Sequence, residues 1–142
     1  MKKLTLMIMA VMIASFAFAQ KEQKKNIPAQ VEKTFQKQFP NATKVKWEKE
    51  GAKYEANFTL DKTEQSVLID NTGKMVEVEA AIGINQLPKN ILSYVTAHYP
   101  GKAIKEAAKI TDSKGKVTYE AGIKGKDLIF DLNGNFIKES KE

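Results

Sequence analysis

Few residues in this sequence have side chains suited to catalysis. There is one histidine, His98, and there is no cysteine. A catalytic triad would depend on His98 alone, and no serine stands in a Gly-x-Ser-x-Gly or Ser-x-x-Lys context. A metal site needs three or four ligands at suitable spacing, and only isolated carboxylates lie near His98. The sequence therefore predicts no catalytic, cofactor-binding or metal-binding residues, and a protein that is not an enzyme.

Two pairs of glutamates have the residue type needed for general acid-base work: Glu48 with Glu50, and Glu77 with Glu79. Carboxylates that hydrolyse a glycosidic bond face each other across a cleft, about 5 to 10 Å apart. Members of these pairs are two positions apart on one strand, so they project side by side, and we expect a solvated face. A hydrolase would instead need two acidic groups facing across a cleft with raised pKa values.

The segment Asp131-Leu132-Asn133-Gly134-Asn135 is similar to a fragment of a calcium-binding loop. The bidentate glutamate of a complete twelve-residue loop is absent from its required position. Asparagine and glycine both tolerate positive φ, so a hairpin turn explains the segment better.

The composition is that of a globular protein, with 42% hydrophobic and 28% charged residues in 142. This length predicts one domain, or two small units that share a core. All 23 basic residues are lysines, interleaved with glutamates, and the formal net charge is +6. The sequence has no arginine, the side chain that forms bidentate hydrogen bonds with phosphate and guanine, so we expect no nucleic-acid partner.

The N-terminus has the pattern of a secretory signal peptide over residues 1–19. Two lysines precede an apolar run from Leu4 to Phe16, and Ala17-Phe18-Ala19 provides a cleavage site before Gln20. Residues 20–26 carry three lysines and no large apolar residue, which is typical of a solvated spacer. We therefore expect export to a periplasm or the exterior, with no membrane span after cleavage.

The remaining chain contains an internal repeat, predicted to divide it into units at 27–83 and 84–142. Apolar and proline positions recur sixty residues apart, as Ile27-Pro28, Val31, Phe35, Phe39-Pro40 and then Leu87-Pro88, Ile91, Val95, Tyr99-Pro100. This spacing predicts a short helix in each unit, begun and ended near a proline. One unit of about 60 residues would be marginal alone, so the two should share or abut their apolar faces.

Alternating apolar and polar residues after each helix predict antiparallel strands with one apolar and one polar face. Asn71-Thr72-Gly73 and Asn133-Gly134 should close hairpins. The segment 103–110 consists of good helix formers, but it occupies the repeat position of the alternating segment 44–50 and is therefore predicted to be a strand. The expected fold is α+β, with two tandem α-β-β-β-β repeats and short helices packed on one face of antiparallel sheet. The large aromatic side chains fall mostly on the apolar alternation and should pack under the helices: Trp47, Tyr54, Phe58, Tyr119 and Phe130.

These motifs together resemble the PepSY-like family of secreted bacterial proteins. The resemblance covers about Ile27 to Lys138 and includes the aromatic-Pro helix ends, the repeated Tyr-Glu-Ala and the Asp-x-x-Gly hairpins at Asp70 and Asp131. It implies a fold like that of the β-lactamase inhibitor protein, with two tandem units of a helix and four strands, and a role in inhibiting or regulating peptidases. It implies no particular site residue.

The leading hypothesis is a secreted, non-enzymatic binding module for an envelope or extracellular protein, such as a peptidase or other hydrolase. The alternative is a periplasmic carrier of a small apolar or anionic ligand, which would need a pocket of several hundred Å³ lined by Phe35, Tyr54 or Tyr94. The candidate partner-binding face comprises the polar members of the alternation: Lys44, Lys46, Glu48, Glu55, Asn57, Glu77, Glu79, Thr118 and Glu120.

Overall fold

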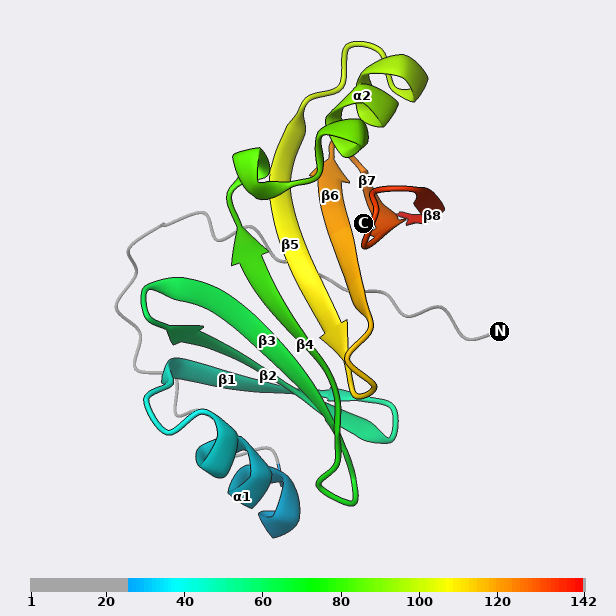
Figure 1. Ribbon diagram of the computed structural model, residues 1–142. Helices are drawn as coiled ribbons and strands as arrows, with labels where there is room; N and C mark the ends of the chain where they lie inside the picture. The colour runs from blue at the N-terminus through cyan, green and yellow to red at the C-terminus, as the bar shows by residue number, and fades with distance from the viewer. Residues whose placement is uncertain (1–25, 142) are drawn as a thin grey trace.

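The computed structural model describes residues 26–141. The predicted signal peptide, 1–19, and the predicted spacer, except its last residue, lie outside the described residues. Within them the chain forms two helix-plus-four-strand units in one antiparallel sheet, so the predicted α+β fold with a tandem repeat is confirmed (Figure 1).

The two α-helices, α1 (Ala29–Gln38) and α2 (Lys89–His98), begin immediately after a proline. Pro28 and Pro88 are the N-cap residues, and their carbonyl oxygens accept hydrogen bonds from the N–H groups of Val31 and Ile91, each at 2.9 Å. The C-cap residue of each helix is an aromatic residue, Phe39 or Tyr99, that directly precedes the next proline, and that proline cannot continue the helix. Both helices are ten residues long, and each buries a valine and one larger apolar side chain.

Eight strands form one sheet in sequence order, each antiparallel to the next. They are β1 (Thr43–Glu50), β2 (Lys53–Leu60), β3 (Thr63–Asp70), β4 (Met75–Ile82), β5 (Ile104–Asp112), β6 (Val117–Ile123), β7 (Lys126–Asp131) and β8 (Phe136–Ser140). A short 3-10 helix, η1 (Ile84–Gln86), connects β4 to α2. The segment of helix formers at 103–110 lies largely in β5, so the prediction made from the repeat is confirmed over helix propensity.

Aspartates hold the hairpin turns, as the Asp-x-x-Gly pattern predicts. The Oδ1 atoms of Asp70 and Asp131 accept backbone N–H bonds from the residues two and four positions later, at 2.8 to 3.1 Å. Asp112 makes the same pair of bonds at the β5–β6 turn, a third copy that the sequence analysis missed. The turns also anchor the helices, because Thr34 Oγ1 donates to the Gly73 carbonyl at 2.7 Å and Asn90 Nδ2 donates to the Asn133 carbonyl at 2.7 Å.

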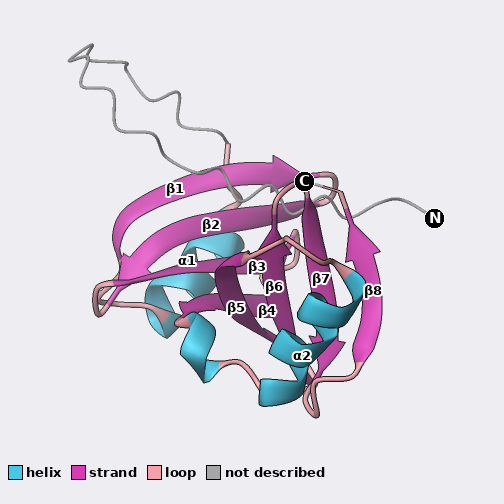
Figure 2. Ribbon diagram, turned by 90° about the horizontal axis from the view of Figure 1, so that it is seen from above, coloured by secondary structure: helices cyan, strands magenta, loops and turns pink. Residues whose placement is uncertain are grey.

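Both helices cover the same face of the sheet. Val31 and Phe35 of α1 pack on Ala56, Phe58, Val67 and Ile69 of the first unit, and Ile91 and Val95 of α2 pack on Ala107, Ala121, Leu128 and Phe130 of the second. Strand β4 joins the two clusters, because Val78 packs against the first and Ile82, on the same side of the strand, against the second. Figures 1 and 2 show α1 beside the β1–β3 half of the sheet and α2 beside the β5–β8 half.

The aromatic residues predicted to pack under the helices do so. Phe58 and Phe130 are buried, while Trp47, Tyr54 and Tyr119 are half-buried against the same clusters. The opposite face of the sheet carries no helix within residues 26–141.

Candidate functional site

The face of the sheet that points away from the helices is here called the polar face. Cross-strand pairs place its side chains in rows that cross the sheet. One row is Lys46, Asn57, Ser66, Glu79, Ile110, Thr118 and Asp131; a second is Glu48, Glu55, Leu68, Glu77 and Asp112; a third is Ala81, Ala108, Glu120, Ile129 and Lys138. The rows bring residues from both units onto one continuous surface.

Eight of the nine residues in the predicted partner-binding face occupy these rows. The remaining residue, Lys44, lies in a β-bulge of β1 between Thr43 and Lys46, and its φ is 54°. It has no partner in the β1–β2 register, so the simple alternation that placed it beside Lys46 is interrupted there.

The expectation that this face is uniformly solvated is wrong at its centre. Glu79 is 7% exposed, Glu120 is 3% exposed, and Asp127, which the sequence analysis did not select, is 5% exposed. These three residues are here called the acidic centre. Leu68 and Ala108 are buried on the same face, and the strands of the first unit cross those of the second at a steep angle (Figure 1). Alternation determines the side of a strand to which a residue points, but it does not determine the twist that buries the middle of that side.

Burial strongly perturbs two carboxyl groups of the polar face. The pKa of Glu79 rises to about 9, first because burial disfavours the charged form and then because of the negative charges on Glu120, Glu55, Glu77 and Asp127. The pKa of Glu120 rises to about 7, again first by burial and then by the charges of Asp127, Glu106 and Glu77. Glu79 therefore keeps its proton at neutral pH, and Glu120 is half-ionised there.

Two half-buried glutamates flank the acidic centre, and their pKa values are also raised. Burial is the main cause for Glu55, opposed by a hydrogen bond with the Ser66 side chain. Burial is again the main cause for Glu77, opposed by the positive charges of Lys53 and Lys138. The acidity of this face is thus only partly balanced by its lysines.

One oxygen of Glu79, Oε2, is buried without a hydrogen-bond partner. Buried polar groups in folded proteins almost always have a partner, and an unsatisfied one costs about 1 to 3 kcal/mol. The centre of the polar face therefore contains one buried carboxyl oxygen that the described residues leave without a hydrogen bond.

The geometry does not form the carboxylate pair of a hydrolase. Glu79 and Glu120 have raised pKa values, but both project from one sheet face instead of facing each other across a cleft. Among residues 26–141, no group of three or more His, Asp or Glu side chains is arranged to hold a metal ion. His98 is exposed, stacks on Tyr94 with ring centroids 4.0 Å apart, and contacts the Tyr94 carbonyl through Nδ1 at 3.0 Å.

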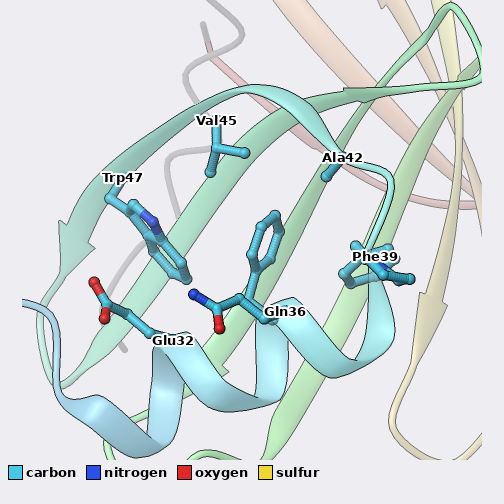
Figure 3. A pocket seen from close by; sticks show the side chains of 8 residues that line it. Glu32, Gln36, Phe39, Ala42, Val45 and Trp47 are labelled. Carbon is cyan, nitrogen blue, oxygen red and sulfur yellow. The ribbon is translucent and has the colours of Figure 1, made fainter.

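A groove of about 380 Å³ lies between α1 and β1 (Figure 3). Trp47 and Glu32 lie toward one end and Phe39 toward the other. Phe35 forms the apolar wall, with its ring centroid 5.2 Å from that of Trp47 and 5.5 Å from that of Phe39. The complete lining is Glu32, Phe35, Gln36, Phe39, Pro40, Ala42, Val45 and Trp47.

A match to a family model identifies the protein family to which this sequence belongs. The model described as "Putative beta-lactamase-inhibitor-like, PepSY-like" matches the chain twice, over residues 19–77 and 53–138. The chain therefore belongs to the PepSY-like family, as the motifs predicted. No curated protein matches this sequence.

Solved structures with the same fold come from Bacteroides species. One from Bacteroides eggerthii, described as "putative periplasmic proteins", has a TM-score of 0.72 at 13% identity and covers 80% of this chain and 88% of its own. A DUF2874 family protein from Bacteroides ovatus has a TM-score of 0.69 at 19% identity, covering 80% and 86%. A BLIP-like protein from Bacteroides fragilis has a TM-score of 0.64 at 23% identity, also covering 80% and 86%. No helix in the described part of this chain is long and apolar enough to cross a membrane.

Proposed function

We propose that this protein is an exported, non-enzymatic binding module whose polar face engages an envelope or extracellular protein, such as a peptidase or other hydrolase. One observation carries the proposal. The two units together present a helix-free sheet face on which polar side chains from both repeats form continuous rows. Such a surface, broad and with mixed charge, suits a protein better than a small substrate.

The comparisons support the same class of function. The family description refers to inhibitor-like proteins, and one structure of the same fold is described as BLIP-like. Another is described as periplasmic, which agrees with the export signal predicted at residues 1–19. The proposed location is therefore the periplasm or the exterior, after cleavage near Ala19-Gln20.

Lysine-directed crosslinking in the native cells, with the full chain exported by its own leader, tests the proposal. The expected result is one protein partner linked through polar-face lysines, Lys46 and Lys53, rather than through Lys33 and Lys37 of α1. The variant Lys46→Glu should lower the yield of this product, and the matched variant Lys33→Glu should not. Links only through the α1 lysines, or no reproducible capture, would contradict the proposal.

The groove beside α1 favours a second candidate, a carrier of a small apolar ligand. It is lined by Phe35, as that alternative requires, but Glu32 at its rim disfavours an anionic ligand. Trp47 is the only tryptophan in the sequence, so its fluorescence reports directly on the groove. If the protein is a carrier, micromolar 8-anilinonaphthalene-1-sulfonamide, an uncharged probe, should quench the fluorescence of Trp47 in a saturable way. The variant Phe39→Ala should lose that quenching. Unchanged fluorescence would remove this candidate.

A further inference from the structure

We propose that the acidic centre of the polar face receives a cationic side chain of the protein partner, a lysine ammonium or an arginine guanidinium, which contacts Glu79 and Glu120. The inference rests on the proposed function, because it names the group that the polar face recognises.

The charges that face this position are mostly negative, although the whole chain has a net charge of +6. The neighbouring acids come from six strands, whereas the lysines of the same face lie on the two edge strands, β1 and β8, and at the start of β2. The acids are Glu48, Glu55, Glu77, Glu79, Glu106, Asp112, Glu120, Asp127 and Asp131, and the lysines are Lys46, Lys53 and Lys138. The acidity is thus a local property of this face.

A second observation points to a ligand at this position. Glu79 is 93% buried, and its Oε2 atom has no hydrogen-bond partner. An arginine or lysine side chain supplies several N–H donors together with a positive charge. It can therefore donate a hydrogen bond to the unpartnered oxygen and offset the negative charge of the neighbouring acids. A protein partner can deliver such a group on the long, flexible stem of a lysine or arginine side chain.

Two alternatives fit the geometry less well. An anion would be repelled by the surrounding carboxylates. A metal ion needs several ligands around one point, and the described side chains are not arranged in such a group. In the third row the small side chains of Ala81 and Ala108 lie on one side of Glu120, and Ile129 lies on the other.

Binding of a cation here is coupled to release of a proton. The free protein holds the Glu79 proton at neutral pH, and a cation favours the ionised carboxylate instead. Because only the ionised form binds well, affinity should rise with pH by up to about tenfold per unit between pH 7 and 8, and more steeply below pH 7, where Glu120 must also lose a proton. Lysine and arginine side chains stay charged throughout this range.

The test uses a tri-arginine peptide with blocked ends as the probe and the exported full chain as the receptor. Isothermal titration at pH 7 in two buffers with different ionisation enthalpies gives both the affinity and the number of protons released. We expect proton release on binding, and a loss of affinity of at least tenfold in Glu79→Gln and Glu120→Gln. The matched control Glu64→Gln removes an exposed acid of β3 that is outside the candidate partner-binding face and should change affinity less than threefold.

Equal weakening by Glu79→Gln and Glu64→Gln would overturn the inference, because it would indicate diffuse attraction to all the acids of the sheet. Absence of binding, or binding without proton release, would overturn it as well. These outcomes are distinguishable from failure of the proposed function. If the native partner still crosslinks through Lys46 and Lys53, and Glu79→Gln does not alter the yield, the polar face remains the binding surface and only the cationic contact is wrong.

Discussion

The raised pKa of Glu79 makes the stability of this protein depend on pH in an unusual direction. The ordinary pKa of a glutamate is 4.5, and in the folded protein burial raises that of Glu79 to about 9. Below pH 4.5 the folded and unfolded states both hold the proton. Between the two values only the folded state holds it, so unfolding releases a proton and rising pH favours unfolding. Most buried carboxylates with charged partners act in the opposite direction.

The size of the effect follows from this linkage. Each pH unit inside the window lowers the free energy of unfolding by about 1.4 kcal/mol. Glu120, whose pKa rises to about 7, adds a similar slope only below that pH. Between pH 7 and 8.5 Glu79 therefore acts almost alone. Over this range the free energy of unfolding should fall by about 2 kcal/mol, which lowers the midpoint of urea unfolding by about 1 M.

The assay is urea unfolding followed by circular dichroism at pH 7, 7.5, 8 and 8.5. Wild type should lose stability across this series, whereas Glu79→Gln, which keeps the shape but cannot titrate, should be nearly flat. Glu48→Gln, at an exposed position of the same face, should keep the wild-type slope. Parallel slopes for wild type and Glu79→Gln would refute the argument that Glu79 is buried and protonated.

Three further predictions concern the scaffold. Gly73→Ala should lower the free energy of unfolding by about 2 kcal/mol, because φ at this position is +88° and the new Cβ would lie 2.9 Å from the Gln30 carbonyl oxygen. The control Gly51→Ala, at φ +60° with no atom close to the new Cβ, should lower it by less in the same urea assay. Phe130→Ala should cost about 3 to 5 kcal/mol by thermal unfolding, since Phe130 is fully buried, and Leu132→Ala, 58% exposed, should cost little. Tyr99 should titrate near pH 12 by ultraviolet absorbance, because its hydroxyl donates to Glu139, and should shift down toward 10 in Glu139→Gln; an unchanged titration would contradict that hydrogen bond.

The repeat made most of the fold predictable. Apolar spacing located both helices, and alternation located the strands and the side to which each residue points. In the segment 103–110 two kinds of sequence information disagree. The helix propensity of its residues favours a helix, and only its position in the repeat identified the strand β5. Here tertiary pairing with β4 and β6 decides the conformation.

The interior of the site was not predictable in the same way. Glu79 and Glu120 have the sequence pattern of solvated strand residues, and their burial depends on the twist of eight strands together. Asp127 was missed because it precedes the apolar run of β7 and resembles a turn residue. The Asp112 turn carried a visible signal, since Asp112-Ser113-Lys114-Gly115 repeats the spacing of Asp70-Asn71-Thr72-Gly73.

The central claim, that the polar face binds the partner, is tested most directly by two double charge reversals that leave the net charge unchanged. Lys46→Glu with Glu48→Lys alters exposed residues of the polar face, and Glu32→Lys with Lys33→Glu alters exposed residues of α1 on the opposite side. The measurement is the Kd of each variant for the partner captured by crosslinking. We predict at least a tenfold loss of affinity for the polar-face variant and wild-type affinity for the α1 variant. The reverse pattern, or equal affinities, would contradict the claim.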